Sequence, residues 1–261
     1  LNKKFDVIIP VPTFSLYEKY SKIFHANVKY IFLKEENEFS FDIEEIYKKI
    51  SKNTRIIFLC SPNNPTGKSI SNEILKIVEE NPKIYFFIDE AFIEFSDNKS
   101  LCEYVNNFEN LFVSRSMTKF FSLAGLRIGY GIGNKKIIRK LLKRKVEWNV
   151  NSLAQIAGIE SLKDFEYIQK SKILLKEEKK KFFDALSNIN KLKVYPSDAN
   201  FFLINLKSLK ARYVKKKMLE NGILIRDCSN FKGLDDNYIR ACVNNTENNE
   251  KFVNIIKKIM S

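Results

Sequence analysis

Histidine and cysteine are scarce in this chain of 261 residues, which holds one histidine, His25, and four cysteines. No two cysteines have the CxxC spacing. Structural zinc sites and Cys/His nucleophilic sites need clusters of these residues, so the sequence argues against both and we expect no bound metal. The cysteine usage also favours a reducing compartment over a disulfide framework.

Long apolar runs are absent as well. No stretch approaches the roughly 20 apolar residues that a membrane helix needs, and the chain opens without a signal-peptide pattern. We therefore expect a cytoplasmic protein without a membrane partner. The hydrophobic content of 44% and aromatic content of 13% are typical of a folded globular protein. A chain of this length can bury a sizeable core, in one large domain or two smaller ones.

Acidic residues are too few to balance the basic ones, and the formal net charge is +14. The excess is mostly lysine, in runs such as 179–181 and 215–217. Such charge can bind nucleic acid. However, the runs fall on predicted helices without a recognised binding motif, so we interpret them as solvated faces and expect no nucleic-acid partner.

Apolar strands and helical patterns alternate over the first 150 residues. The strands are predicted near 5–9, 28–33, 55–60, 84–88, 111–113 and 128–132. Near-continuous apolar strands joined by helices predict an α/β fold with a mainly parallel sheet sandwiched by helices. In such sheets, ligands bind where the strands end.

The pattern changes after residue 151. A long helical region, predicted to be interrupted, runs to about residue 188, and short strands follow near 192–195, 200–204, 223–225 and 238–243. This order predicts a smaller C-terminal α+β domain. We place the boundary near residue 150, with a large domain over 1–150 and an interdomain helix plus small domain over 151–261.

One strand end carries a lysine, Lys119, among groups that suit a phosphate. The hydroxyls of Ser116 and Thr118 precede it, and Arg127 follows. Together they can hold a phosphate while the amine stays beside it. A solvated, idle lysine is the plain alternative, because this chain is rich in lysine.

Two more strand ends carry polar groups. The segment SPNNPTG at 61–67 forms a rigid turn, from which the Asn64 amide can donate to a phenolate oxygen. Asp89 ends an apolar strand, where a buried carboxylate needs a cationic partner such as a pyridinium nitrogen. A plain turn and an N-cap aspartate are the alternatives. All three segments in this order are much more specific than any one alone.

These three segments resemble those of the class I and II aminotransferases, pyridoxal phosphate enzymes of fold type I, near the histidinol-phosphate aminotransferase branch. The resemblance covers nearly the whole chain. It implies pyridoxal 5'-phosphate as the cofactor, bonded covalently to Lys119, with Asp89 on the pyridine nitrogen and Asn64 on the ring hydroxyl. It implies that the cofactor phosphate is held by Ser116, Thr118 and Arg127. The family's dimer leads us to expect a homodimer.

Residues 222–249 resemble the threonine-phosphate decarboxylases of cobalamin biosynthesis more closely. Arg226 and Arg240 match the arginines that bind the substrate phosphate and carboxylate in that family, and a guanidinium fork suits both oxyanions. Phe92 points the same way, because most aminotransferases of this group have tyrosine there. The resemblance implies a lyase that converts L-threonine O-3-phosphate, a small phosphorylated amino acid, to (R)-1-aminopropan-2-yl phosphate.

Two other functions stay open. One is an aminotransferase of the histidinol-phosphate type, which keto-acid-dependent turnover would reveal. The other is a non-catalytic remnant, because the resemblance places a glycine-rich phosphate loop, a ring-stacking aromatic and an N-terminal arm upstream of Pro12. Asn244 also replaces an arginine of the decarboxylase pattern.

Overall fold

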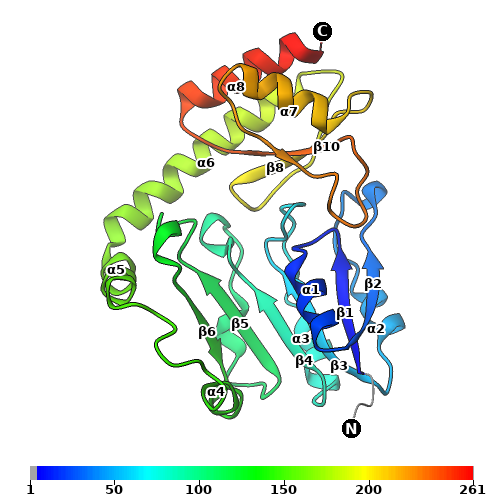
Figure 1. Ribbon diagram of the computed structural model, residues 1–261, viewed down its shortest axis with the longest axis vertical. Helices are drawn as coiled ribbons and strands as arrows, with labels where there is room; N and C mark the ends of the chain where they lie inside the picture. Colours follow the sequence, from blue (N-terminus) through cyan, green and yellow to red (C-terminus); the bar gives the residue numbers. More distant parts are fainter. Residues whose placement is uncertain (1–4, 261) are drawn as a thin grey trace.

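A computed structural model describes residues 5–260, which form two β-sheets flanked by helices (Figure 1). The larger sheet has the strand order β2-β1-β3-β4-β5-β6. Its strands are β1 (Asp6–Val11), β2 (Asn27–Phe32), β3 (Thr54–Cys60), β4 (Tyr85–Asp89), β5 (Leu111–Ser116) and β6 (Gly129–Gly133). Every neighbouring pair is parallel except β5 and β6. The prediction of a mainly parallel sheet is thus confirmed.

Helices α1 to α4 flank this sheet. They are α1 (Leu16–Ile23), α2 (Ile43–Lys49), α3 (Ile74–Glu80) and α4 (Lys135–Leu142). Helix α2 begins after Asp42, whose side chain accepts the Glu44 N–H as an N-cap. One face of the sheet packs on α2 and α3 through a core that includes Ile46, Ile57 and Phe86. The strands are apolar on this face because the helices cover it.

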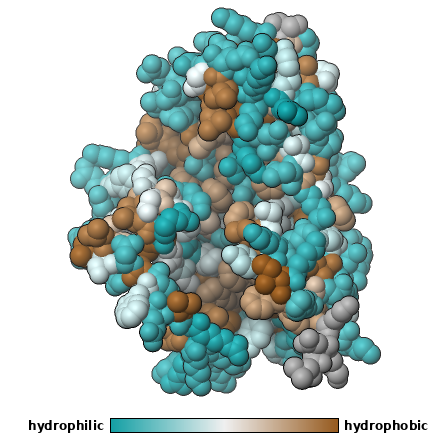
Figure 2. Space-filling model, in the orientation of Figure 1, coloured by the Kyte–Doolittle hydropathy of each residue, from teal (hydrophilic) through white to brown (hydrophobic). Residues whose placement is uncertain are grey.

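The opposite face of the sheet is covered less completely. Helix α1 packs on β1 and β3 through Tyr17, which lies against Val7, Ile9 and Phe58. Farther along, Phe87 and Phe112 are only half-buried and line an apolar recess beside α4. Figure 2 shows the molecule hollowed between its β5–β6 side and its α1 side.

The smaller sheet is antiparallel, with the order β7-β8-β10-β9. Two helices lead to it, α5 (Ser152–Lys163) and α6 (Phe165–Ser187), and Asp164 interrupts them as predicted. The rest comprises β7 (Lys193–Val194), β8 (Phe201–Asn205), α7 (Ala211–Glu220), β9 (Arg226–Asp227), β10 (Tyr238–Cys242) and α8 (Thr246–Met260). Helices α6, α7 and α8 cover this sheet (Figure 1). The strand expected at 223–225 begins instead at Arg226. We keep the domain boundary near residue 150 as a proposal.

Two sets of contacts fasten the small sheet to the large one. Glu35, which follows β2, accepts hydrogen bonds from the hydroxyls of Tyr195 at 2.5 Å and Tyr238 at 2.7 Å. Gly67 lies against Ser197, and the N–H of Asp198 donates to the Gly67 carbonyl at 2.7 Å. A Cβ at Gly67 would lie 2.0 Å from the Ser197 Oγ, so only glycine fits this approach. These contacts bring β8 and β10 over the carboxyl edge of the large sheet.

No helix within residues 5–260 combines the length and the apolarity that crossing a membrane requires.

Candidate active site

The carboxyl ends of β3, β4 and β5 lie side by side at one edge of the large sheet. In the strand register, Cys60 pairs with Asp89, and Asp89 pairs with Ser114. All three strands are parallel, so the segments that follow them emerge at the same edge. The three segments singled out in the sequence are therefore neighbours in space.

Asp89 is held by donors on both carboxylate oxygens. Its Oδ1 accepts from the Ala91 N–H at 3.0 Å and from the Ser114 hydroxyl at 3.4 Å. Its Oδ2 accepts from the hydroxyl of Tyr17 at 2.5 Å. The carboxylate is thus fixed at the strand end. Residues 93–95 form a short 3-10 turn, so no α-helix follows for Asp89 to cap.

Lys119 lies in a small polar cluster beyond β5. Its Nζ is 3.2 Å from the Ser116 Oγ, which lies 2.7 Å from the Thr118 Oγ1 and also accepts the Thr118 N–H at 3.3 Å. Arg127 has a left-handed backbone (φ 54°) and donates to the Ala124 carbonyl at 2.9 Å. Two hydroxyls and a guanidinium beside an amine form a set of donors that suits a phosphate.

The environment of Lys119 lowers the pKa of its amine. Partial burial is the main cause, and the positive charges of Arg127 and Arg240 add to it, while Asp89 opposes the shift in pKa. The Nζ also lies 5.5 Å from the ring centroid of Phe92. A lower pKa increases the fraction of neutral amine, which is the nucleophilic form.

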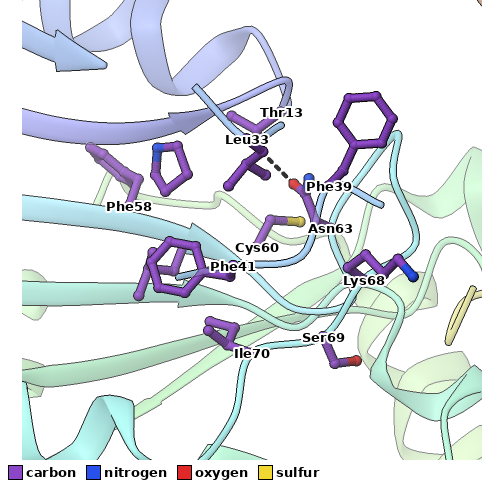
Figure 3. Close-up of a pocket in the computed structure, with 12 residues that line it drawn as sticks. Thr13, Leu33, Phe39, Phe41, Phe58, Cys60, Asn63, Lys68, Ser69 and Ile70 are labelled. Carbon is purple, nitrogen blue, oxygen red and sulfur yellow. Dashed lines mark hydrogen bonds between the residues drawn. The ribbon is translucent and has the colours of Figure 1, made fainter. Parts of the chain in front are cut away.

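The turn at 61–67 is anchored by Asn63 and leaves Asn64 facing the small sheet. Asn63 is buried and accepts from the Thr13 hydroxyl at 2.7 Å (Figure 3). It also donates to the Pro12 carbonyl and the Thr66 hydroxyl, both at 2.9 Å. The neighbouring Asn64 accepts from Arg240. Asn63 therefore has a structural role, and Asn64 is the amide that a ligand can reach.

An interior cavity behind this turn is too small for a cofactor. Its volume is about 20 Å³, and Cys60, Asn63 and Ser69 are among its lining residues (Figure 3). That space holds about one water molecule. This cavity is therefore not a cofactor site, and the predicted site lies on the other side of the turn, toward Lys119 and Arg240.

Arg240 reaches the cluster from the small sheet. It donates to the Asn64 side-chain oxygen, and its guanidinium lies 4.7 Å above the ring of Phe201. The Phe201 ring meets the Phe92 ring edge-on at 5.1 Å, and Phe92 in turn lies beside Lys119. A chain of direct contacts therefore joins Arg240 to Lys119.

Arg226 lies on β9, directly opposite Arg240 in the antiparallel register. It donates to the Asn230 side-chain oxygen at 2.8 Å, and its guanidinium lies 5.3 Å from the Phe231 ring. Arg226 is exposed, and its guanidinium contacts Asn230 and Phe231 of its own loop. The structure thus brings Arg240 into the cluster and leaves Arg226 one strand farther out.

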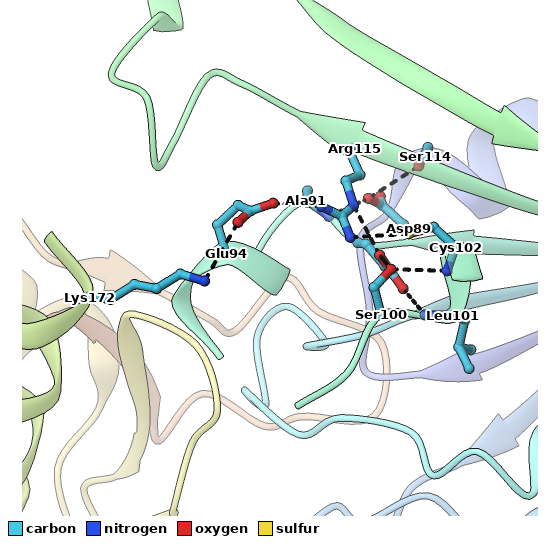
Figure 4. Close-up of polar contacts among 10 residues, drawn as sticks. Asp89, Ala91, Glu94, Ser100, Leu101, Cys102, Ser114, Arg115 and Lys172 are labelled. Carbon is cyan, nitrogen blue, oxygen red and sulfur yellow. Dashed lines mark hydrogen bonds and ion pairs between the residues drawn. The ribbon is translucent and has the colours of Figure 1, made fainter. Parts of the chain in front are cut away.

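A buried ion-pair network lies behind the site (Figure 4). Glu90 accepts from the Ser100 hydroxyl at 2.5 Å, the Leu101 N–H at 2.8 Å and the Arg115 Nε at 3.1 Å. Arg115 also contacts Glu94 at 2.6 Å. Because Glu90 follows Asp89 and Arg115 follows Ser114, the network joins the two strand ends that carry the site.

Sequence reasoning missed three of these residues. They are Glu90, which adjoins Asp89, and the aromatic residues Phe14 and Tyr17, which follow shortly after Pro12. Phe14 is partly exposed, and its ring meets Tyr17 edge-on at 5.6 Å. Aromatic side chains thus lie near Asp89 within the chain, and the ring-stacking aromatic expected upstream stays a prediction.

The sequence profile of the family described as aminotransferase class I and II matches residues 1–256. The chain belongs to this family. The histidinol-phosphate aminotransferase of Methanococcus aeolicus is 36% identical over 263 residues, which cover 100% of this chain and 71% of that protein. The Methanosarcina mazei protein of the same name is 38% identical over 253 residues, covering 97% and 67%.

Solved structures of aminotransferase relatives share the fold. The histidinol-phosphate aminotransferase from Clostridium acetobutylicum has a TM-score of 0.92 at 35% identity, covering 98% of this chain and 78% of that one. The L-threonine-O-3-phosphate decarboxylase from Porphyromonas gingivalis has a TM-score of 0.86 at 28% identity, covering 98% and 77%. The fold-type-I expectation is confirmed.

These comparisons overturn the prediction of a threonine-phosphate decarboxylase. The curated relatives named above are histidinol-phosphate aminotransferases, and the solved aminotransferase is more similar than the solved decarboxylase in both sequence and fold. The prediction went wrong because Arg226 and Arg240 report on oxyanion recognition, and Phe92 is a single apolar position that performs no step of the reaction. Groups that bind a phosphate or a carboxylate do not decide which bond of the substrate breaks.

Pyridoxal phosphate is the cofactor of this aminotransferase family, and the residues present fit it. Asp89 would offer a fixed carboxylate to the ring nitrogen, and Lys119 would offer an amine of lowered pKa. The hydroxyls of Ser116 and Thr118, with Arg127, would offer donors to its phosphate. The individual roles of these residues stay predictions.

Proposed function

We propose that the chain is an aminotransferase that moves an amino group between histidinol phosphate and a dicarboxylic keto acid. The names and similarity of the curated relatives support this substrate. The observation that carries the proposal is the 35–38% identity to curated histidinol-phosphate aminotransferases. The arginine pair of the small sheet, with Arg240 in contact with the Asn64 turn and Arg226 directly opposite it, agrees with that substrate. Two cations there suit substrates that carry oxyanions.

Each arginine has a role in this reaction. Arg240 would bind the α-carboxylate of the keto acid, because it lies within the contact chain that leads to Lys119. Arg226, one strand farther out, would bind the phosphate of histidinol phosphate and the distal carboxylate of the keto acid. The two substrates would then use one site in turn.

Lys119 would move the proton. Histidinol phosphate carries no carboxylate on its amino-bearing carbon, so the bond that breaks there is C–H, and a base must take the proton. The Lys119 amine is suited to this role because its lowered pKa favours the neutral form. The bound cofactor supplies the electron-withdrawing ring that makes this proton acidic.

Asp89 and Asn64 would orient the ring. Asp89 would hold the ring nitrogen in its protonated form, and Asn64 would donate to the ring hydroxyl. Ser116, Thr118 and Arg127 would anchor the phosphate, so that the ring cannot turn away from Lys119.

We also propose a homodimer. Support comes from α5, where the apolar side chains of Leu153, Ile156 and Ile159 are exposed. Contiguous exposed apolar surface is typical of interaction sites. Light scattering measures the mass directly, and a monomer at micromolar concentration would contradict the dimer.

The reaction is tested with the chain loaded with pyridoxal phosphate. We expect histidinol phosphate and 2-oxoglutarate to yield glutamate, and no CO2 to be released from threonine phosphate. Lys119→Ala should abolish turnover, whereas Lys170→Ala, on the exposed face of α6, should not change it. Arg226→Gln should raise the KM for histidinol phosphate more than the KM for histidinol. CO2 release without a keto acid would contradict the proposal.

A further inference from the structure

Tyr17 makes a contact that joins α1 to the end of β4, across 72 positions of the chain. Its ring is buried and stacks on Phe58, with centroids 5.3 Å apart and planes 7° from parallel. Its hydroxyl points to Asp89 and donates to Oδ2 at 2.5 Å. The ring is therefore held by packing, and the hydroxyl is directed at one carboxylate oxygen.

Three donors contact the Asp89 carboxylate, and each contacts one particular oxygen. The Ala91 N–H and the Ser114 hydroxyl contact Oδ1, and Tyr17 contacts Oδ2. The Ala91 N–H comes from the segment after β4, and the Ser114 hydroxyl comes from the neighbouring strand β5. Both contact Oδ1, so they fix the position of that oxygen only. The orientation of Oδ2 depends on the contact from α1. A carboxylate oxygen can accept a second hydrogen bond, so Oδ2 keeps an acceptor site for a ligand.

We propose that Tyr17 is the positioning residue of Asp89, and that its hydroxyl orients Oδ2 toward the ring nitrogen of the cofactor. This inference rests on the proposed function, since it concerns the same site. Tyr17 acts through Asp89 and need not touch the cofactor itself.

Packing alone does not account for the hydroxyl. Phe58 stacks on the Tyr17 ring, and Phe87 lies at 6.5 Å, so a phenylalanine would fill the same space. Burial, with the neighbouring Cys60 and Asp89, raises the pKa of Tyr17 well above its usual value. The hydroxyl therefore stays protonated and donates throughout the working pH range.

The experiment measures cofactor affinity and not turnover. Dissociation constants are determined by absorbance titration for pyridoxal phosphate and for its 1-deaza analogue, in which carbon replaces the ring nitrogen. The variants are Tyr17→Phe, which keeps the ring, and Tyr20→Phe, which removes an exposed hydroxyl from the same helix as a control. Thermal unfolding of each variant is recorded in parallel.

We expect Tyr17→Phe to weaken pyridoxal phosphate binding about tenfold, the effect of losing one hydrogen bond to a charged group. Binding of the analogue should not change, because it offers no ring nitrogen to Asp89. Tyr20→Phe should match the unaltered chain with both compounds.

Two results would overturn the assignment. Equal weakening of both compounds in Tyr17→Phe would mean that Tyr17 only supports the local fold, and no change with either would mean that its hydroxyl is idle. If the unaltered chain bound neither compound, the proposed function would be wrong as well. The titration thus separates failure of this inference from failure of the function on which it rests.

Discussion

Replacing Glu90 with glutamine removes one charge from the network behind the site and preserves the shape of the side chain. The Glu90 side chain is 2% exposed and accepts from Ser100, Leu101 and Arg115. All three partners are donors, so the amide group of a glutamine would face at least one of them with a donor of its own. Arg115 would keep only Glu94 as an ionic partner.

The cost of this change follows from the burial of the pair. Removing one partner of a buried ion pair costs about 3–5 kcal/mol, because the remaining charge stays desolvated. Arg115 is 16% exposed and keeps Glu94 at 2.6 Å, so we expect the lower end, about 3 kcal/mol. In a chain of this size each kcal/mol lowers the melting temperature by about 2–4 °C, so the loss should be roughly 6–12 °C.

Thermal unfolding, followed by circular dichroism, measures the effect of Glu90→Gln. The matched control is Glu109→Gln, which breaks the ion pair with Lys136, where the side chains are 61% and 67% exposed. Exposed pairs contribute about 0–1 kcal/mol, so the control should melt within about 4 °C of the unaltered chain. If the two variants melted together, the reasoning from burial would be refuted.

Two further results are expected. Arg240→Lys should raise the KM for the keto acid about 10- to 100-fold in steady-state assays, because lysine cannot bind a carboxylate with two parallel hydrogen bonds or stack on Phe201. An unchanged KM would show that Arg240 does not bind the substrate. Burial would raise the pKa of Asp6, but bonds from Lys29 and Ser51 outweigh it and lower that pKa from 3.8 to about 2. Asp6 should therefore contribute about 2 kcal/mol above pH 3.8, lost as the pH falls toward 2. Chemical denaturation at several pH values should show this loss, and Asp6→Asn should lack it; equal pH dependence in both chains would contradict the assignment.

The sequence by itself determined the six strands of the large sheet and predicted the polar groups at their ends. Apolar runs joined by helical patterns sufficed for the parallel sheet, since a strand buried on both faces must be apolar along its length. The placement of Asp89 and Lys119 at one edge followed from the same reasoning, because parallel strands end together. These are local or topological properties, which the order of residues expresses directly.

Only the tertiary structure decided which distant residues meet. Asn63 and Asn64 are alike in sequence, and the hydrogen bonds of Asn63 to Thr13 and Pro12 separate the structural amide from the reachable one. The contact of Tyr17 with Asp89 depends on how α1 packs against β3, which no local pattern states. Likewise, Arg226 and Arg240 did not distinguish decarboxylation from transamination. A guanidinium group binds phosphate and carboxylate alike, whichever bond of the substrate breaks. Long-range contacts of this kind depend on strand register and side-chain packing, which are settled only when the whole chain has folded.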